Sequence, residues 1–220
     1  MTNALSVGCS FLLAASVTFS ASGQNTLDLA ALARDPTVSI HNRTATSLGD
    51  GTRRGIHLNA QQGDGLLWIP GVVLREGIIE IDVRGRNAPG QSFVGVAFDG
   101  KDDDTFEAIY VRPFNFRAED SQRLAHAIQY ISHPEYPWHR LRNEHPGRFE
   151  SALDPAPDPN EWVHLQIVLE ERRVYVYVNG SDKSTLAVER IGGQSGGRVG
   201  LFVGNNSEGD FSNLEFRSPG

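Results

Sequence analysis

Cysteine, long apolar runs and positive charge are all scarce in this sequence. The one cysteine among the 220 residues is Cys9, so the chain beyond it can form no internal disulfide. Beyond residue 25, no segment approaches the roughly 20 apolar residues of a membrane span. Asp and Glu outnumber Lys and Arg, which gives a formal net charge of -7. The charge argues against nucleic acid or anionic lipid as the partner, and a neutral ligand such as carbohydrate fits better.

The first 25 residues differ in character from the rest of the chain. They contain no charged side chain, and residues 4–19 form an apolar stretch of the length found in signal peptides. Ala21, Ser22 and Gly23 then supply the small residues that a signal peptidase requires. Although no Lys or Arg precedes the apolar stretch, the pattern predicts a signal peptide over residues 1–23 and a secreted or periplasmic protein.

Residues 24–220 are dominated by short alternating segments that turn residues separate. The hydrophobic content of 39% is enough for one buried core, which predicts a single domain. Strands are predicted where apolar residues alternate: 79–83, 94–98, 163–169, 174–178, 199–203 and 214–216. We expect the first two to be antiparallel neighbours, and the third and fourth to form a hairpin. Strands at this spacing must close into a sandwich or barrel to cover their edges.

One long segment, about 114–158, breaks this pattern. It is rich in Pro, His, Arg and Asp, and it is long for a loop in a compact domain. Its aromatic and histidine residues favour an ordered insertion over a disordered one. We expect an irregular insertion with a short helix near 139–144 and a strand that carries His126, Gln129 and Tyr130. If that strand is regular, His126 and Tyr130 share one face.

Several of the strand and turn motifs resemble a known family. They are, in order, GIIEIDV (77–83), SFVGVAF (92–98), TFEA (105–108), AIQY (127–130), NEW (160–162), VYVNG (176–180) and GRVGLFVGN (197–205). The chain resembles the 3-keto-disaccharide hydrolase-like family of secreted bacterial proteins, which have a laminin G-like jelly roll. The resemblance implies an all-β, concanavalin A-like jelly-roll sandwich of two antiparallel sheets.

The same resemblance implies cleavage of a glycoside whose sugar carries a ketone at C3. A base would remove the acidified C2 proton, an arginine or a metal would stabilise the enolate, and the aglycone would leave before water adds. The family pattern has an aromatic-Glu-x-Gln motif, which Phe106 and Glu107 match while Ile109 replaces the glutamine. A laminarinase mechanism is not expected, since Glu80 and Asp82 are not followed by a further carboxylate.

Three residues are candidates for the chemistry. Glu107 shares a strand face with Ile109 and Val111, and a carboxyl among apolar neighbours has the raised pKa that an acid or base needs. Pairing of Glu107 with an arginine is the structural alternative. His126 is a second candidate base, or a structural hydrogen-bonding residue. Arg112 follows the strand and could stabilise an oxyanion or anchor a loop.

Six further residues are candidates for sugar binding: Tyr110, Asn115, Gln129, Tyr130, His133 and Trp138. Aromatic rings offer flat surfaces to the apolar faces of sugar rings, or they hold the insertion down as a small core. The histidines after residue 130 lack zinc-ligand spacing. Asp210, before the closing strand, is the candidate ligand of a structural calcium ion.

These observations leave two other readings open. A non-catalytic, lectin-like carbohydrate-binding module needs the same aromatic and polar surface without a perturbed base. An adhesion or scaffold domain of the laminin G kind would instead expose a large apolar patch over residues 130–150 without a pocket. The sequence sets neither the sugar nor the oligomeric state.

Overall fold

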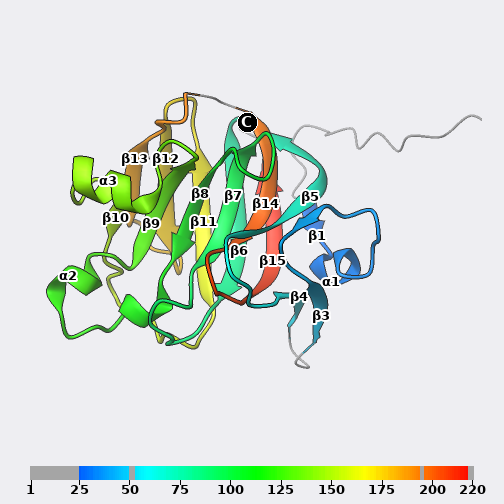
Figure 1. Ribbon diagram of the computed structural model, residues 1–220, viewed down its shortest axis with the longest axis horizontal. Coiled ribbons are helices and arrows are strands. Elements are labelled where there is room, and N and C mark those ends of the chain that lie inside the picture. Colours follow the sequence, from blue (N-terminus) through cyan, green and yellow to red (C-terminus); the bar gives the residue numbers. More distant parts are fainter. Residues whose placement is uncertain (1–24, 50–52, 194–195, 218–220) are drawn as a thin grey trace, which may run out of the picture.

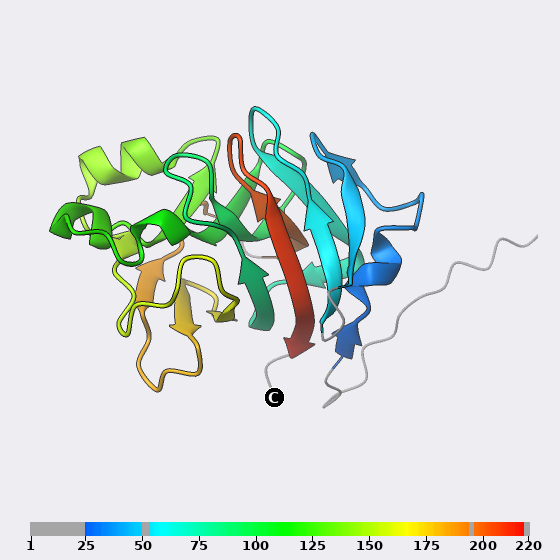
Figure 2. The same ribbon diagram turned by 90° about the horizontal axis from the view of Figure 1, so that it is seen from below.

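The computed structural model describes residues 25–49, 53–193 and 196–217, which form two stacked antiparallel sheets (Figures 1 and 2). The strands of sheet A are β1 (Asn25–Leu27), β3 (Ala45–Gly49), β4 (Arg54–Leu58), β6 (Gly77–Arg84), β11 (Val163–Leu169), β12 (Arg173–Val178), β13 (Leu186–Glu189) and β15 (Gly209–Arg217). Those of sheet B are β2 (Ile40–His41), β5 (Gly65–Leu74), β7 (Val94–Gly100), β8 (Phe106–Val111), β9 (Ile128–His133), β10 (Glu150–Ser151) and β14 (Gly197–Val203). The expected leader, residues 1–23, and Cys9 lie outside the described residues.

Strand order confirms the predicted sandwich. Sheet A runs β13-β12-β11-β6-β15-β4-β3, with β1 paired to β15, and sheet B runs β10-β9-β8-β7-β14-β5-β2. The chain crosses between the sheets several times, as β5, β6 and β7 lie in sheets B, A and B. Such crossings enclose one core between two sheets.

Short helices lie outside the sheets: α1 (Leu29–Leu32), η1 (Pro113–Asn115), α2 (Ser121–Leu124) and α3 (Trp138–Glu144). Asp120 caps α2, since its carboxylate accepts a hydrogen bond from the backbone N–H of Arg123. Figures 1 and 2 place α2 and α3 at one end of the sandwich and α1 at the other. None of the helices in the described ranges has the length and apolarity needed to cross a membrane.

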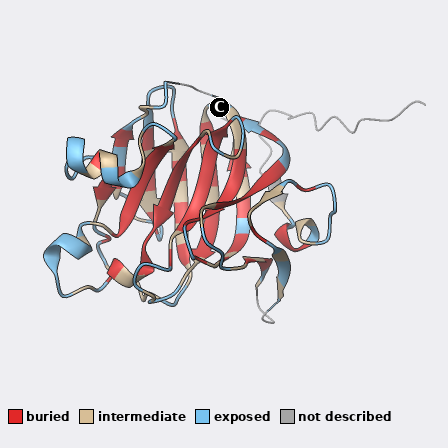
Figure 3. Ribbon diagram, in the orientation of Figure 1, coloured by how far each residue is buried: buried red, intermediate tan, exposed pale blue. Residues whose placement is uncertain are grey.

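Burial follows the faces of the strands. In β11, Val163, Leu165 and Ile167 are buried, while the alternate residues are partly exposed. One face of this strand therefore contacts the core and the other faces solvent. By contrast, β7 and β8 are buried along their whole length (Figure 3), so both faces of sheet B are covered there. The outer face of sheet B is where a site could be enclosed.

The predicted hairpin is confirmed, but one predicted pairing is wrong. Strands β11 and β12 pair with Ile167 opposite Val176. The segments 79–83 and 94–98 are not neighbours, because β6 pairs with β11 and β15 in sheet A, whereas β7 pairs with β8 and β14 in sheet B. Alternation identifies the buried face of a strand but not its partner.

The segment 114–158 is more regular than expected. It contributes β9 and β10 to sheet B, and its helix α3 matches the expected position. The polar residues Gln129 and Ser132 lie within β9 and are nevertheless buried. Gln129 is tolerated there because its amide donates to the carbonyls of Tyr130 and Phe149 at 2.8 and 3.0 Å.

Candidate functional site

A pocket of about 540 Å³ lies over the outer face of sheet B, and we call it the outer pocket. Its aromatic lining comprises Phe93, Tyr110, Phe114, Trp138 and Phe202. Its charged and titratable lining comprises Asp64, Arg112, Arg123, His126, His133, His139 and Arg142. Apolar walls with a few converging polar groups are typical of ligand-binding sites.

Strand alternation explains which side chains reach the outer pocket. Tyr110 lies opposite Gln129, and Phe106 opposite His133, in the β8–β9 register. These residues therefore share the outer face, while Glu107 and Ile109 point to the other face. The ring of Tyr110 on β8 contacts that of Phe202 on β14 with centroids 5.5 Å apart. The two rings meet over Gly95 of the intervening strand β7, which has no side chain, so they form a continuous aromatic floor.

Arg112 is held rigidly at one end of this floor. It is 3% exposed, and its Nη2 donates to the Tyr110 hydroxyl at 2.9 Å and to Gln129 Oε1 at 3.1 Å. Its Nη1 donates to the His126 carbonyl at 3.0 Å. All three acceptors are neutral, so the hydrogen bonds fix the guanidinium without neutralising its charge.

Glu150 supplies a buried carboxylate beside Arg112. Arg142 binds it through both nitrogens of its fork, with Nη2 2.6 Å from Oε2. His126 Nε2 lies 3.1 Å from Oε1, and Arg112 Nη1 lies 3.9 Å from Oε2. One carboxylate thus holds together groups from β10, α3 and the turn before β9.

Trp138, the first residue of α3, forms an exposed wall of the pocket. Its side chain is 45% exposed, and Val73 on β5 is the other exposed large hydrophobic side chain among the described residues. The Arg142 guanidinium, one helical turn later, lies 4.9 Å from the indole centroid. The helix therefore presents an oriented aromatic surface to the cavity.

Asp64 and His133 also line the outer pocket. Burial raises the pKa of Asp64, and the nearby His133 and Arg43 partly oppose this effect. Burial likewise lowers the pKa of His133, against the opposing charge of Asp64. His133 also stacks on Phe106, with centroids 5.2 Å apart and planes 2° from parallel. The two titratable groups are thus brought closer in pKa than they are in water.

Most of the residues expected at a site are brought together here. Six of the nine candidates line the outer pocket: Tyr110, Arg112, Asn115, His126, His133 and Trp138. Gln129 lies beneath it, bonded to Arg112. Their individual roles stay predictions.

Glu107 and Tyr130 do not line the outer pocket, and the expected common face of His126 and Tyr130 is not found. Ile109 shares the face of Glu107 on β8 and lies opposite Tyr130 on β9, so the three side chains are on the same face of sheet B. Ile109 belongs to the core, so Glu107 and Tyr130 also point between the sheets. His126 does reach the pocket because it precedes the regular part of β9, where a turn changes its direction.

Glu107 belongs instead to a buried ionic cluster between the sheets. Its Oε2 lies 3.6 Å from Nε of Arg190, whose guanidinium also contacts Asp99. Burial raises the pKa of Glu107 to about 7, although hydrogen bonds from Tyr130 and from the Gly192 backbone oppose this effect. The expected raised pKa is confirmed, and the arginine pairing is present as well. A side chain at residue 192 would meet Glu107 Oε1, so glycine is needed over this cluster.

Asp210 has protein partners at both carboxylate oxygens. Oδ1 lies 2.7 Å from His57 Nδ1, and Oδ2 accepts hydrogen bonds from Arg84 at 2.8 and 3.0 Å. Calcium binding by Asp210 would require these contacts to break. Within the described ranges, no group of three or more His, Cys, Asp and Glu residues is arranged to hold a metal ion.

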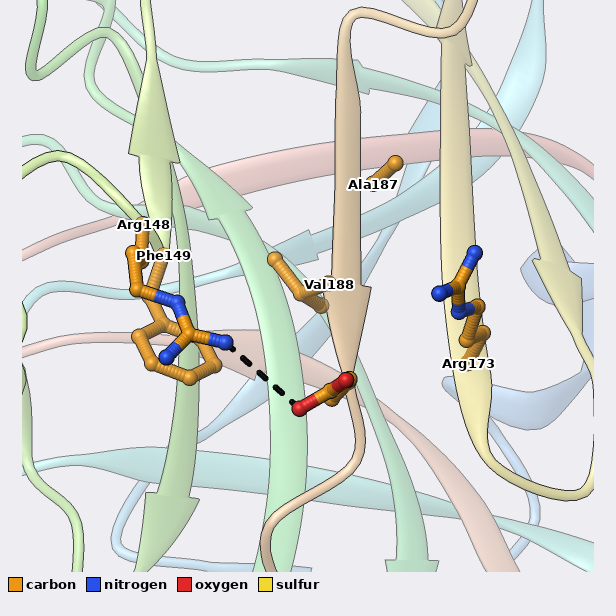
Figure 4. Close-up of a pocket in the computed structure, with 6 residues that line it drawn as sticks. Arg148, Phe149, Arg173, Ala187 and Val188 are labelled. Atoms are coloured by element: carbon orange, nitrogen blue, oxygen red, sulfur yellow. Dashed lines mark hydrogen bonds and ion pairs between the residues drawn. The ribbon is translucent and has the colours of Figure 1, made fainter.

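A second, smaller hollow of about 200 Å³ lies where β13 approaches the segment before β10 (Figure 4). Arg148 pairs there with Glu189 at 3.5 Å, and Arg173 lies on the far side of β13. The one ring in its lining, Phe149, is 3% exposed. The hollow therefore lacks the exposed aromatic surface of the outer pocket.

The pocket also contains residues that sequence reasoning missed. Arg142 carried a usable signal, because it lies four residues after Trp138 in an expected helix and so shares its face. Asp64, Arg123 and Glu150 carried none, since they reach the site from a loop, helix α2 and an edge strand.

Comparison with known proteins supports the fold assignment. No family model and no curated protein sequence matches this chain. Among solved structures, the carbohydrate-binding module CBM66 from Bacillus subtilis is similar, with 17% identity, a TM-score of 0.55, and coverage of 82% of this chain and 95% of that one. A protein of unknown function with a galectin-like fold, also from Bacillus subtilis, has 12% identity, a TM-score of 0.54, and coverage of 89% and 94%.

A third similar structure is the VIP36 exoplasmic/lumenal domain in its form bound to Ca2+ and Man3GlcNAc. It has 14% identity, a TM-score of 0.52, and coverage of 84% of each chain. Identities this low establish architecture rather than activity. The chain therefore has the concanavalin A-like, galectin-like fold of two antiparallel sheets.

Proposed function

We propose that this protein binds carbohydrate in the outer pocket, as a lectin-like module. The observation that carries the proposal is the exposed Trp138 indole beside the rigid, buried donor group of Arg112 in one cavity. An indole face suits the C–H face of a sugar ring, and fixed polar groups suit its hydroxyls. The fold similarity to a carbohydrate-binding module and to a glycan-bound domain agrees with this proposal.

Rigidity of the polar groups strengthens the argument. Arg112 has hydrogen bonds from two of its nitrogens to three neighbouring groups, so a ligand need not order it. Preorganised donors reduce the entropy cost of binding. Among the described residues, exposed large hydrophobics are limited to Val73 and Trp138. An adhesion surface with a broad apolar patch is therefore less well supported.

The test of this proposal is the affinity of Trp138→Ala. After a glycan-array screen identifies a ligand of the full chain, calorimetry should give roughly thirtyfold weaker binding for Trp138→Ala. Trp138→Phe should recover part of the loss, since it keeps an aromatic face. Val73→Ala, which truncates the other exposed hydrophobic residue, should bind like the wild type. Equal affinity of Trp138→Ala and wild type would place the sugar elsewhere.

Glycoside cleavage in the same pocket is the second candidate, with a 3-keto glycoside as substrate. Burial lowers the pKa of His126, so its imidazole is neutral near pH 7 and can accept a proton. His126 would take the C2 proton to give an enolate, which Arg112 would stabilise. Collapse of the enolate would then restore the C3 ketone and form a C1=C2 bond as the C1–O bond breaks, and the protonated His126 would return a proton to the departing aglycone oxygen. Water would then add to the double bond. Glu107 lies on the other face of β8, so its role as base has less support.

Product analysis separates the two candidates. The chain would be incubated with ordinary and 3-keto disaccharides, with and without EDTA, and products followed by mass spectrometry. Cleavage of 3-keto substrates alone, lost in His126→Asn and kept in Glu107→Gln, would support the enzyme. Binding without product would support the lectin-like module. The EDTA arm tests for calcium, which the similar VIP36 domain binds in its Ca2+ form.

A further inference from the structure

The charges around the outer pocket are unevenly distributed. Three arginines, Arg112, Arg123 and Arg142, line one end, and we call them the arginine cluster. They are linked through shared partners, since Arg112 Nη1 and Asn115 Nδ2 both donate to the His126 carbonyl, and Arg123 Nε donates to Asn115 Oδ1 at 3.3 Å. In a chain of net charge -7, this end of the pocket concentrates positive charge.

Buried negative charge at this end falls short of the positive charge. Glu150 is the buried carboxylate in contact with the cluster, and it binds Arg142 most closely, with the nearest contact at 2.6 Å. Arg112 lies 3.9 Å from Glu150 and otherwise donates to neutral acceptors. Asp120, at the N-terminus of α2, is exposed and accepts from the backbone of Arg123.

Arg123 is the member of the cluster best placed to meet a ligand. Its side chain donates to Asn115 Oδ1 and to the Phe114 carbonyl at 3.1 Å, which are neutral acceptors. Its residue is exposed, whereas Asp64, the pocket's own carboxylate, interacts with His133 and Arg43. A guanidinium fork in this position matches the oxygens of a carboxylate or sulfate.

We propose that the ligand is an acidic sugar, whose carboxylate or sulfate group binds at the arginine cluster while a sugar ring lies against Trp138. The inference rests on the proposed carbohydrate binding and adds the charge of the ligand. With a neutral sugar, the three arginines carry more positive charge than Glu150 balances, whereas an anionic group supplies further negative charge. The net negative charge of the whole chain disfavours polyanions in general, so binding requires this local cluster.

The test compares acidic glycans with their neutralised counterparts on the full chain. Polygalacturonate and alginate oligosaccharides would be paired with their esterified forms, and a sulfated galactan oligosaccharide with its desulfated form, beside neutral glucans, fructans and mannans. We expect at least about tenfold tighter binding of an acidic member than of its neutralised partner, and a smaller ratio in 0.5 M salt, about the concentration at which screening becomes strong. The uronate and sulfate arms identify which anion is preferred.

Variants locate the anion. Arg123→Gln should reduce the acidic-to-neutral affinity ratio by about tenfold, because one charge-assisted interaction is lost. Arg54→Gln, an arginine 76% exposed on β4 of sheet A, should leave the ratio unchanged. Equal or tighter binding of neutral sugars would overturn the inference but keep the proposed function. If no glycan binds, both the proposed function and this inference are overturned. An unchanged acidic-to-neutral affinity ratio in Arg123→Gln would overturn the position assigned to the anionic group.

Discussion

Replacing Glu150 by glutamine should lower the free energy of unfolding by about 3 kcal/mol, roughly a 6–12 °C fall in Tm. The Glu150 side chain is 4% exposed and lies between Arg142, His126 and Arg112. Removing the charge leaves the buried Arg112 without its ion-pair partner. Chemical denaturation of the purified variant, followed by circular dichroism, measures the loss.

A control variant distinguishes the effect of burying an ion pair from the effect of ion pairing alone on the free energy of unfolding. Glu189 also pairs with an arginine, Arg148, but its side chain is 62% exposed at the smaller hollow beside β13. Glu189→Gln should therefore cost only about 0–1 kcal/mol. Similar losses for the two variants would show that the Glu150 cluster does not hold the pocket floor together.

The buried carboxyl of Glu107 should make the protein less stable as the pH rises from about 4.5 to 7. Its pKa is raised from 4.5 to about 7 in the folded protein, so the folded state keeps a proton that the unfolded chain has lost. Above pH 7 the native state holds an ionised carboxylate between the sheets. Glu107→Gln should match the wild type near pH 4 and be more stable by about 3 kcal/mol near pH 8.

This prediction is checked by urea denaturation of both proteins between pH 4 and pH 8. The difference between variant and wild type removes the contribution of other titrating groups. Glu135→Gln, at a side chain that is 77% exposed, should change the free energy of unfolding by no more than about 0.5 kcal/mol. A Glu107→Gln variant that is less stable than wild type at pH 8 would mean that the Arg190 ion pair outweighs the cost of burial.

Local patterns predicted strands well and their partners poorly. The hairpin over 163–178 was predictable because its turn is short and both strands alternate strictly. The pairing of 79–83 with 94–98 was not, because the chain passes from sheet A to sheet B between them. The strand β9 was only partly predictable, since Gln129 and Ser132 interrupt its apolar pattern. The hydrogen-bond partners of β9 and of the Gln129 side chain come from distant segments of the chain.

The candidate site was predictable in part for the same physical reasons. Alternation correctly placed Glu107 on the same face of its strand as Ile109. It could not reveal which face meets sheet A, because both faces of β8 are buried, one against the core and one beneath the outer pocket. The charge pattern was also hidden, since Arg123, Arg142 and Glu150 are separated along the chain and meet only through the fold.

Export of the protein stays a proposal from the sequence, because the apolar leader lies outside the described residues. Sequencing the N-terminus of the protein recovered from an expressing bacterial culture would test it.

The most direct test of carbohydrate binding at the outer pocket uses the three tryptophan indoles as reporters. Trp138 lines the pocket, Trp68 is buried in β5, and Trp162 lies beside sheet A between the guanidinium groups of Arg53 and Arg84. During titration with a ligand from the glycan screen, the indole N–H resonance of Trp138 should shift with the binding isotherm while that of Trp162 stays in place. A shift of Trp162 with Trp138 unmoved would contradict the account and assign the sugar to sheet A.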